Sequence, residues 1–202
     1  EIVIGDWSSD VCSSDLAVTG ASGSGKSTFL TLVGGITTAS NGEIVINGKN
    51  ITSMSEKELA KFRLENIGFV FQAYNLIPEM TAYQNIILPL KLAHKKIDKK
   101  YLSDICNKLS ISDRLSHLPS ELSGGQQQRV AIARALITKP SILLCDEPTG
   151  NLDKKSSEDV LDLLTQLCAD NGCTLILVTH DKSVADRMGR IITISDGEIL
   201  ED

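Results

Sequence analysis

The chain has 202 residues, 42% of them hydrophobic and 23% charged, with a formal net charge of -6. This length suits one α/β domain with a full core and room for a helical subdomain, and it excludes two such domains in tandem. The acidic balance provides no broad positive surface, so nucleic acid is not an expected partner. The longest apolar runs are too short to span a membrane and no signal peptide is visible, so we expect membrane association only through partners.

The first sixteen residues do not look biological. Residues 6–16, DWSSDVCSSDL, resemble the translated read-through of a sequencing adapter, and residues 1–5 fit the bases that precede it. We therefore predict that residues 1–16 are an artefact and exclude them from fold reasoning. Trp7 could stack on an adenine, but its place in this segment argues against that role. Only Leu16 remains to begin the first strand.

A phosphate-binding loop follows the apolar strand expected at residues 16–19. Residues 20–28 read GASGSGKST, in which glycines let the backbone N–H groups face an anion. Lys26 would reach the β and γ oxygens of ATP, and the Ser27 hydroxyl would ligate Mg²⁺. A chance glycine-rich turn before an amphipathic helix is the alternative. The nucleotide-binding residues expected in this loop are Gly20, Ser22, Gly23, Ser24, Gly25, Lys26, Ser27 and Thr28.

The next segments alternate between short strands and helices. Residues 42–51, GEIVINGKNI, predict a hairpin that turns at Asn47-Gly48 in a small antiparallel sheet. Residues 55–64 predict a polar helix, and residues 67–71 a buried strand that ends at Gln72.

About fifty residues separate Gln72 from Leu122, and they carry helical patterns at 82–93 and 99–109. Pro78, Pro89 and Pro119 punctuate this interval. We expect a compact helical subdomain at about residues 73–135. Four lysines at positions 95, 96, 99 and 100 predict a solvated turn between helices, and His94 and His117 are expected at the surface.

A second glycine-containing helix start follows. Residues 122–129 read LSGGQQQR, and Ser123 with Gln126 has the form of a capping box, so a helix should begin here and end before Pro140. The positive end of a helix is an anion site. An ordinary capped surface helix explains Ser123 and Gln126 but not Gly124 and Gly125, which cost about 1 kcal/mol each relative to Ala.

Two adjacent carboxylates end the next apolar strand, residues 141–145. A buried parallel strand delivers Asp146 and Glu147 to the sheet edge where such sheets bind ligands. Asp146 suits Mg²⁺, through water or Ser27. Glu147 suits the general base on an attacking water, because it lies one residue further along and points to the opposite side of the strand. Two solvated carboxylates at a strand end are the alternative.

The remainder of the chain predicts a helix with one apolar face around residues 160–167, a strand at 174–179, and a strand at 190–195 that turns at Asp196-Gly197. Five cysteines, at positions 12, 106, 145, 168 and 173, show no C-x-x-C pair and no metal spacing. That usage suits a reducing cytosol.

The motifs occur in a fixed order: the phosphate loop, FVFQ ending at Gln72, LSGGQ, ILLCDE, GNLD ending at Asp153, and VTHD around His180. Together they resemble the nucleotide-binding subunit of ATP-binding cassette (ABC) transporters over residues 17–202. The resemblance implies a P-loop NTPase core with a mostly parallel sheet, a small antiparallel β subdomain that is N-terminally incomplete here, and a helical subdomain that carries LSGGQ. It also implies ATP hydrolysis coupled to transport.

The resemblance assigns roles that the pattern alone leaves open between function and an ordinary structural side chain. Gln72 would touch Mg²⁺ and the water while moving with a membrane partner, and His180 would contact the γ-phosphate. Asp153 would cross a dimer interface. Ser123, Gly124, Gly125 and Gln126 would meet the γ-phosphate held by a second copy, in a head-to-tail homodimer with two ATP molecules.

The block FVFQAYNLIPEMTAYQNIILPL and the segment CDEPTGNLD resemble the branch of macrolide exporters, lipoprotein-releasing complexes, the cell-division ATPase and peptide-resistance transporters. This implies integral membrane permease subunits as partners, at the cytoplasmic face of a bacterial cell membrane. The alternatives are the ATPase of an importer and a soluble, non-transport ABC ATPase. A regulatory module that does not hydrolyse ATP is expected to lack Glu147, His180 or part of LSGGQ, and this chain has all of them.

Overall fold

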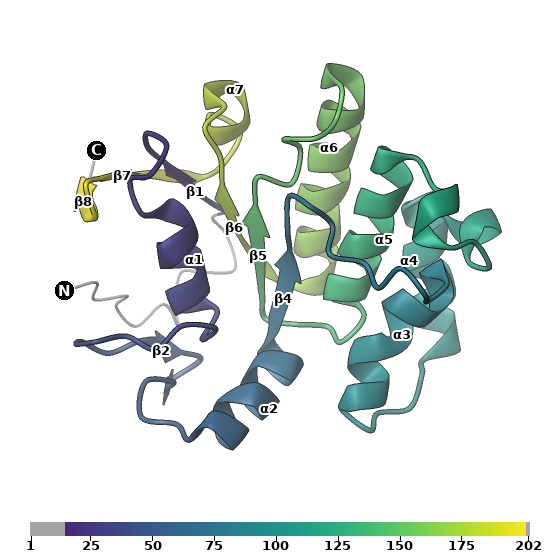
Figure 1. The fold of residues 1–202 in the computed structure, drawn as a ribbon, viewed down its shortest axis with the longest axis horizontal. Coiled ribbons are helices and arrows are strands. Elements are labelled where there is room, and N and C mark those ends of the chain that lie inside the picture. The colour runs from purple at the N-terminus through teal and green to yellow at the C-terminus, as the bar shows by residue number, and fades with distance from the viewer. Residues whose placement is uncertain (1–14, 201–202) are drawn as a thin grey trace.

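A six-stranded sheet forms the centre of the computed structural model, which describes residues 15–200. The strand order is β4-β5-β6-β1-β7-β8, and every neighbouring pair is parallel except β7 with β8. Figure 1 shows helices on both faces of this sheet. The strands are β1 (Leu16–Thr19), β4 (Ile67–Val70), β5 (Ile142–Asp146), β6 (Thr174–Val178), β7 (Arg190–Ser195) and β8 (Glu198–Leu200).

Alternation along the strands builds two cores, because successive side chains point to opposite faces. On one face, Val18 and Leu144 pack with Leu30 of α1 (Lys26–Val33). On the other face, Ala17 and Leu143 belong to the core that includes α5 (Gly124–Leu136) and α6 (Lys154–Asn171). A short helix, α7 (Lys182–Ala185), follows β6. The fold predicted from the sequence is therefore confirmed.

A separate two-stranded ribbon, β2 (Val45–Ile46) and β3 (Lys49–Asn50), forms the small antiparallel sheet. Asn47 and Gly48 both have positive φ, 52° and 69°, as the predicted two-residue turn requires. The polar helix α2 (Glu56–Asn66) follows, and Ser55 caps it in a capping box with Glu58.

The helical region contains α3 (Ala82–Leu92), α4 (Lys99–Lys108) and the 3₁₀ turns η2 (Ser112–Arg114) and η3 (Pro119–Glu121). Pro89 lies inside α3, within the helical pattern that the sequence predicts at residues 82–93. A proline in a helix costs about 3 kcal/mol. Burial of Ile86, Ile87 and Leu90 on the same helix offsets that cost.

His117 is also not the plain surface residue that we expected. Its backbone carbonyl accepts a hydrogen bond from Ala82 N–H at 2.8 Å. Its Nδ1 is buried and has no hydrogen-bond partner among the described residues. His94 is exposed, as predicted.

The first described residues lie against the sheet. Leu16 is buried and begins β1, as the sequence predicts. Asp15 is half-buried, and this burial raises the pKa of its carboxyl although the Leu175 N–H donates to it. The interpretations of Trp7 and Cys12 lie outside the described residues. Cys106, Cys145, Cys168 and Cys173 are all buried free thiols.

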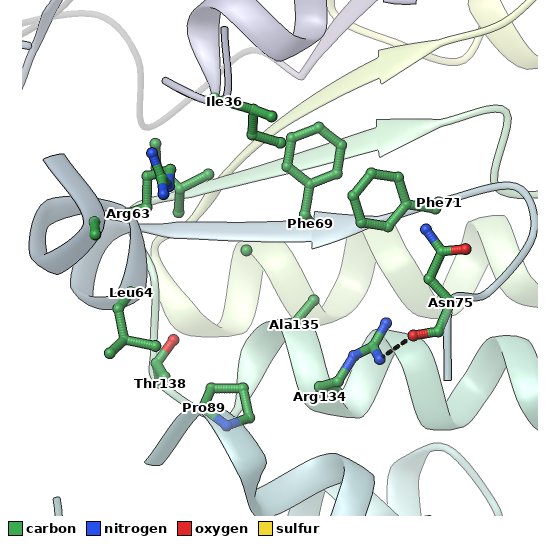
Figure 2. A pocket seen from close by; sticks show the side chains of 14 residues that line it. Ile36, Arg63, Leu64, Phe69, Phe71, Asn75, Pro89, Arg134, Ala135 and Thr138 are labelled. Carbon is green, nitrogen blue, oxygen red and sulfur yellow. Dashed lines mark hydrogen bonds between the residues drawn. The ribbon is translucent and has the colours of Figure 1, made fainter. Parts of the chain in front are cut away.

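A groove of about 380 Å³ runs along the edge strand β4, between α2 and the helical region. Figure 2 shows Phe69 and Phe71 side by side on one wall, with Arg134 pointing to Asn75 on the other side. The two phenyl rings stack with centroids 4.4 Å apart. Within residues 15–200, no helix is both long and apolar enough to cross a membrane.

Candidate active site

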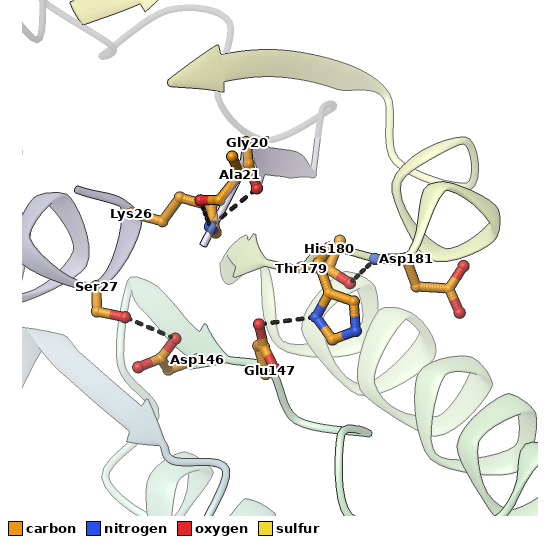
Figure 3. Close-up of polar contacts among 9 residues, drawn as sticks. All are labelled: Gly20, Ala21, Lys26, Ser27, Asp146, Glu147, Thr179, His180 and Asp181. Atoms are coloured by element: carbon orange, nitrogen blue, oxygen red, sulfur yellow. Dashed lines mark hydrogen bonds and ion pairs between the residues drawn. The ribbon is translucent and has the colours of Figure 1, made fainter. Parts of the chain in front are cut away.

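Candidate residues from four motifs lie at the carboxyl ends of β4, β5, β6 and β1, which are adjacent in the sheet. The phosphate loop follows β1, Gln72 lies two residues after β4, Asp146 ends β5, and His180 lies two residues after β6. Because the strands are parallel, these ends lie at one edge of the sheet, the usual position of a ligand site in such folds. Figure 3 shows part of this cluster.

Glycine conformation shapes the phosphate loop. Gly20 has a φ of 146°, and a Cβ there would lie 2.1 Å from the Ile194 carbonyl oxygen. Gly25, with a φ of 106°, precedes α1, and no side chain caps the helix. The N–H groups of the first turn, including Ser27 and Thr28, therefore have no intrahelical partner. They add to the positive end of the helix dipole, so this terminus suits an anion.

The loop closes around its own lysine. Lys26 Nζ donates to the carbonyl oxygens of Gly20 at 3.0 Å and Ala21 at 2.7 Å, and the residue is only 8% exposed. The Ser24 hydroxyl is buried inside the loop without a partner among the described residues. A cradle with a buried ammonium and an unpaired hydroxyl fits the phosphates of ATP. Ser22 and Gly23 lie on its exposed side.

The hydroxyl predicted to hold Mg²⁺ lies next to the carboxylate predicted to share it. Ser27 Oγ donates to Asp146 Oδ1 at 3.4 Å. Burial raises the pKa of Asp146, and the neighbouring Glu147 adds to that effect, while the Ser27 hydrogen bond and Lys26 oppose it. Asp146 is thus a partly buried carboxylate whose negative charge the neighbouring groups do not fully balance. Such a carboxylate suits a divalent cation of the kind that prefers oxygen ligands. Among the described residues there is no cluster of three or more His, Cys, Asp or Glu side chains to hold a metal.

Glu147 lies beyond β5 and contacts His180. Its Oε1 is 2.9 Å from His180 Nδ1, and Figure 3 shows the two side chains facing one another. The expected separation from Asp146 is present, but the reason that we gave, strand alternation, is wrong. Glu147 has a φ of 44°, so a left-handed turn and not the pleat directs its side chain.

His180 is at the open side of the site. Its side chain is 69% exposed, whereas that of Glu147 is 23% exposed. Directly before it, the buried Thr179 accepts a hydrogen bond from Asp181 N–H at 3.0 Å. An exposed imidazole next to a partly covered carboxylate can reach a group that arrives from solvent.

The Gln72 side chain lies beside the turn that follows Glu147. A Cβ on Gly150 would come within 2.7 Å of Gln72 Nε2, and the Gln72 carbonyl accepts from Asn151 Nδ2 at 2.9 Å. Among the described residues, its hydrogen bonds include none to Ser27 or Asp146. Its role as a metal ligand therefore stays a prediction.

The LSGGQ helix begins as the sequence predicts. Ser123 N–H donates to Gln126 Oε1 at 2.9 Å, and Gln126 N–H donates to Ser123 Oγ at 3.3 Å. This capping box leaves the first-turn N–H groups of Gly124 and Gly125 without an intrahelical partner. Because α5 and α1 pack on opposite faces of the sheet, this helix start belongs to a different surface from the phosphate loop (Figure 1).

Asp153 caps the long helix α6. Its carboxylate accepts from Ser156 Oγ at 2.6 Å and from Ser156 N–H at 3.1 Å. The two hydrogen bonds lower the pKa of this carboxyl. Within one chain Asp153 has a structural role, and its place at a dimer interface stays a prediction.

Sequence reasoning missed two amides that tie the motifs together. Gln128 is fully buried, and its Nε2 donates to the Pro148 carbonyl at 2.6 Å. Asn151 holds the Gln72 carbonyl. The signal for Gln128 was its place on the same face of the helix as Ala131 and Ala135, where burial is expected.

Comparisons with known proteins agree with this geometry. The family described as "ABC transporter" matches residues 12–150. The ABC transporter ATP-binding protein YtrE of Bacillus subtilis is 47% identical over 186 residues, covering 91% of this chain and 80% of that protein. The lipoprotein-releasing system ATP-binding protein LolD of Syntrophus aciditrophicus is 44% identical over 187 residues, covering 92% and 84%.

The fold also matches a solved cassette. The dimeric structure of a post-hydrolysis state of the ATP-binding cassette MJ0796, bound to ADP and Pi, aligns with a TM-score of 0.84 and 39% sequence identity. The alignment covers 93% of this chain and 85% of that one.

Proposed function

We propose that this chain, which belongs to the ABC transporter family and is an ATPase, powers a membrane permease through ATP-driven dimerisation. The work would be export, extraction or peptide resistance at the cytoplasmic face of a bacterial membrane. Similarity to the ATP-binding protein of a lipoprotein-releasing system supports export or extraction. The GNLD segment that ends at Asp153 supports it over an importer.

The observation that carries the proposal is the separation of the two carboxylates at one sheet edge. Asp146 contacts Ser27 beside the phosphate loop, and Glu147 contacts His180. In this proposal Asp146 would hold a cation and Glu147 would accept a proton. This division of roles is what hydrolysis by an attacking water requires.

The phosphate loop would bind ATP through the backbone N–H groups of α1 and through Lys26. Ser27 and Asp146, with Gln72, would hold Mg²⁺, which supplies positive charge to the phosphate oxygens when bound. Glu147 would accept the proton of the attacking water, and His180 would contact the γ-phosphate. The His180 imidazole also restrains the Glu147 carboxylate through the hydrogen bond between them.

A second copy would complete each site. The glycine N–H groups at the start of α5 lie on a different surface from the chain's own phosphate loop, so they can serve the nucleotide of another molecule. A related cassette is a dimer with ADP and Pi. The proposed assembly is a head-to-tail homodimer in which Ser123, Gly124, Gly125 and Gln126 face the partner's ATP and Asp153 lies at the interface.

The permease would dock in the groove along β4. Phe71 lines this groove and directly precedes Gln72, so pressure on the phenyl ring would move the glutamine toward or away from the site. Apolar walls and the exposed Ile36, at 51% exposure, suit an amphipathic segment of a partner protein. Membrane association of this chain would come from that contact.

Replacement of Glu147 by Gln tests the proposal. The amide keeps the size and hydrogen bonding of the side chain but cannot accept the water's proton, so we expect ATP binding to persist while phosphate release stops. Trapped ATP should then hold two copies together. Phosphate release and the size-exclusion mass with Mg-ATP measure both effects, with Glu43→Gln as a control on an exposed carboxylate. Turnover close to that of the parent would remove Glu147 from the base role.

A further inference from the structure

Gln128 is a buried amide with a hydrogen bond at only one of its two polar atoms among the described residues. The residue is 0% exposed, and its Nε2 donates to the Pro148 carbonyl at 2.6 Å. Its Oε1 is buried and has no partner among the described residues. An apolar side chain of similar length would remove the unpaired Oε1, but it would leave the buried Pro148 carbonyl without its donor. Packing alone therefore does not account for a glutamine here.

The turn that Gln128 holds is the one that carries Glu147. Gly150 N–H donates to the Glu147 carbonyl at 3.0 Å and closes a four-residue turn, with Pro148 as its second residue. The Glu147 N–H donates to Val178 at 3.0 Å. A glutamate in the left-handed region is strained, and such a conformation persists only where its surroundings fix it. The Gln128 bond is one of those restraints.

The other end of α5 holds a second left-handed segment. Arg134 donates to the carbonyls of Asn75 at 2.6 Å and Tyr74 at 2.8 Å. Tyr74 and Asn75 have φ values of 61° and 48°, and they follow Gln72 closely in the chain. Gln128 and Arg134 are six residues apart, so a single rigid helix spaces the two attachments by about 9 Å.

We propose that Gln128 is a positioning residue that sets the Glu147 carboxylate for proton transfer. Helix α5 connects the Glu147 turn, through Gln128, to the Tyr74–Asn75 segment, through Arg134. A movement of that segment beside the groove would therefore move the Glu147 carboxylate. Asn151, which bonds the Gln72 carbonyl, closes the same network from the other side. The inference rests on the proposed role of Glu147 as general base.

Gln128→Met tests the inference, because methionine keeps the length and volume of the side chain and removes both amide groups. We expect kcat to fall at least about tenfold, as expected when a catalytic group is misplaced. The KM and Kd for ATP should stay within about twofold, while the unpaired Pro148 carbonyl should lower the melting temperature only by several degrees. Gln127→Met is the matched control, since the side chain of the neighbouring Gln127 donates to the Leu122 carbonyl and not to the Glu147 turn.

A second measurement separates positioning from folding. In the Glu147→Gln background, Gln128→Met should leave the ATP-trapped dimer at its full yield, because the lost bond acts on the base and not on nucleotide capture. Two results overturn the inference: a Gln128→Met kcat within about twofold of the parent, or parallel losses of kcat, ATP affinity and melting temperature. Normal turnover by Glu147→Gln alone instead overturns the proposed role of Glu147.

Discussion

The helix starts of α1 and α5 use glycine in opposite ways. Before α1, Gly25 adopts a φ of 106° and no side chain caps the first turn. Before α5, Ser123 has a φ of -64° and forms a complete capping box with Gln126. At the start of α1, no side chain accepts a hydrogen bond from the first-turn N–H groups. At the start of α5, Ser123 accepts from the Gln126 N–H, so the N–H groups of Gly124 and Gly125 remain for a ligand. An anion therefore gains more from the first.

A lysine adds to the difference. Lys26 places a buried ammonium in the phosphate loop, held by the carbonyls of Gly20 and Ala21. The first turn of α5 contains Gly124, Gly125 and Gln126 and so brings no charge of its own. We therefore expect the phosphate loop to capture a nucleotide alone, and in the proposed head-to-tail dimer the LSGGQ start would add contacts to a nucleotide that the partner already holds.

The largest expected effect comes from Lys26→Ala. Hydrogen bonds to charged groups contribute about 1.5–3 kcal/mol each, so we expect ATP affinity to fall by more than about tenfold. Calorimetric titration with Mg-ATP measures it, with the exposed Lys49→Ala as the control. An unchanged affinity would show that the backbone donors of α1 suffice without the ammonium.

The second-largest effect is expected from a substitution at the start of α5. Ser123→Arg places a bulky cation where the partner's γ-phosphate would sit, so we expect ATP turnover to stop while binding to the chain's own phosphate loop remains. Phosphate release and ATP titration separate these outcomes. Normal hydrolysis by this variant would refute the role of α5 in the partner's site.

Mixing the two variants tests whether the starts work in trans. A heterodimer of Ser123→Arg and Lys26→Ala chains keeps one composite site with both elements intact, whereas each homodimer has none. We expect partial recovery of phosphate release on mixing, up to the share of heterodimers formed. Activity that stays at the sum of the two separate variants would argue against a shared site.

Local chemistry explains which features the sequence predicted correctly. The spacing of Gly20, Gly25 and Lys26 predicts the phosphate loop, and Ser123 with Gln126 predicts the start of α5. Both patterns involve residues that are close together in the sequence. Apolar runs likewise placed the strands. The left-handed turn at Glu147 was missed because an acidic residue gives no sign of positive φ.

Tertiary packing decides what the sequence leaves open in the helical region. Pro89 normally breaks a helix, but neighbouring buried side chains keep α3 intact. The place of Gln128 on the helix indicated burial but not its partner, because Pro148 lies 20 residues away and meets it only in the folded chain. A polar residue in a helical sequence does not by itself indicate which carbonyl it will bind.

A smaller effect is expected from Ser123→Ala, which removes the cap without adding bulk. Loss of an N-cap costs about 1 kcal/mol, which lowers the melting temperature by about 2–4 °C in a domain of this size. Thermal unfolding followed by circular dichroism measures it, and Ser123→Asn, another good cap, is the control. A loss shared by both variants would contradict the capping role.

The smallest effect concerns a third helix start, that of α6, where a carboxylate supplies the cap. Hydrogen bonds from the Ser156 hydroxyl and N–H lower the pKa of Asp153 below its unfolded value of about 4. A carboxyl group whose pKa is lower in the folded chain than in the unfolded chain stabilises the fold at pH values above its unfolded-state pKa. This stabilisation is lost as the pH falls through its folded-state pKa. Urea unfolding of the parent and of Asp153→Asn should therefore give different free energies of unfolding at pH 7, and the difference should shrink as the pH is lowered below about 4. Ser156→Ala, which removes the hydroxyl donor, should narrow the difference at pH 7, because one of the two bonds to the carboxylate is then gone. A difference that persists unchanged at low pH would mean that the charge of Asp153 does not stabilise α6.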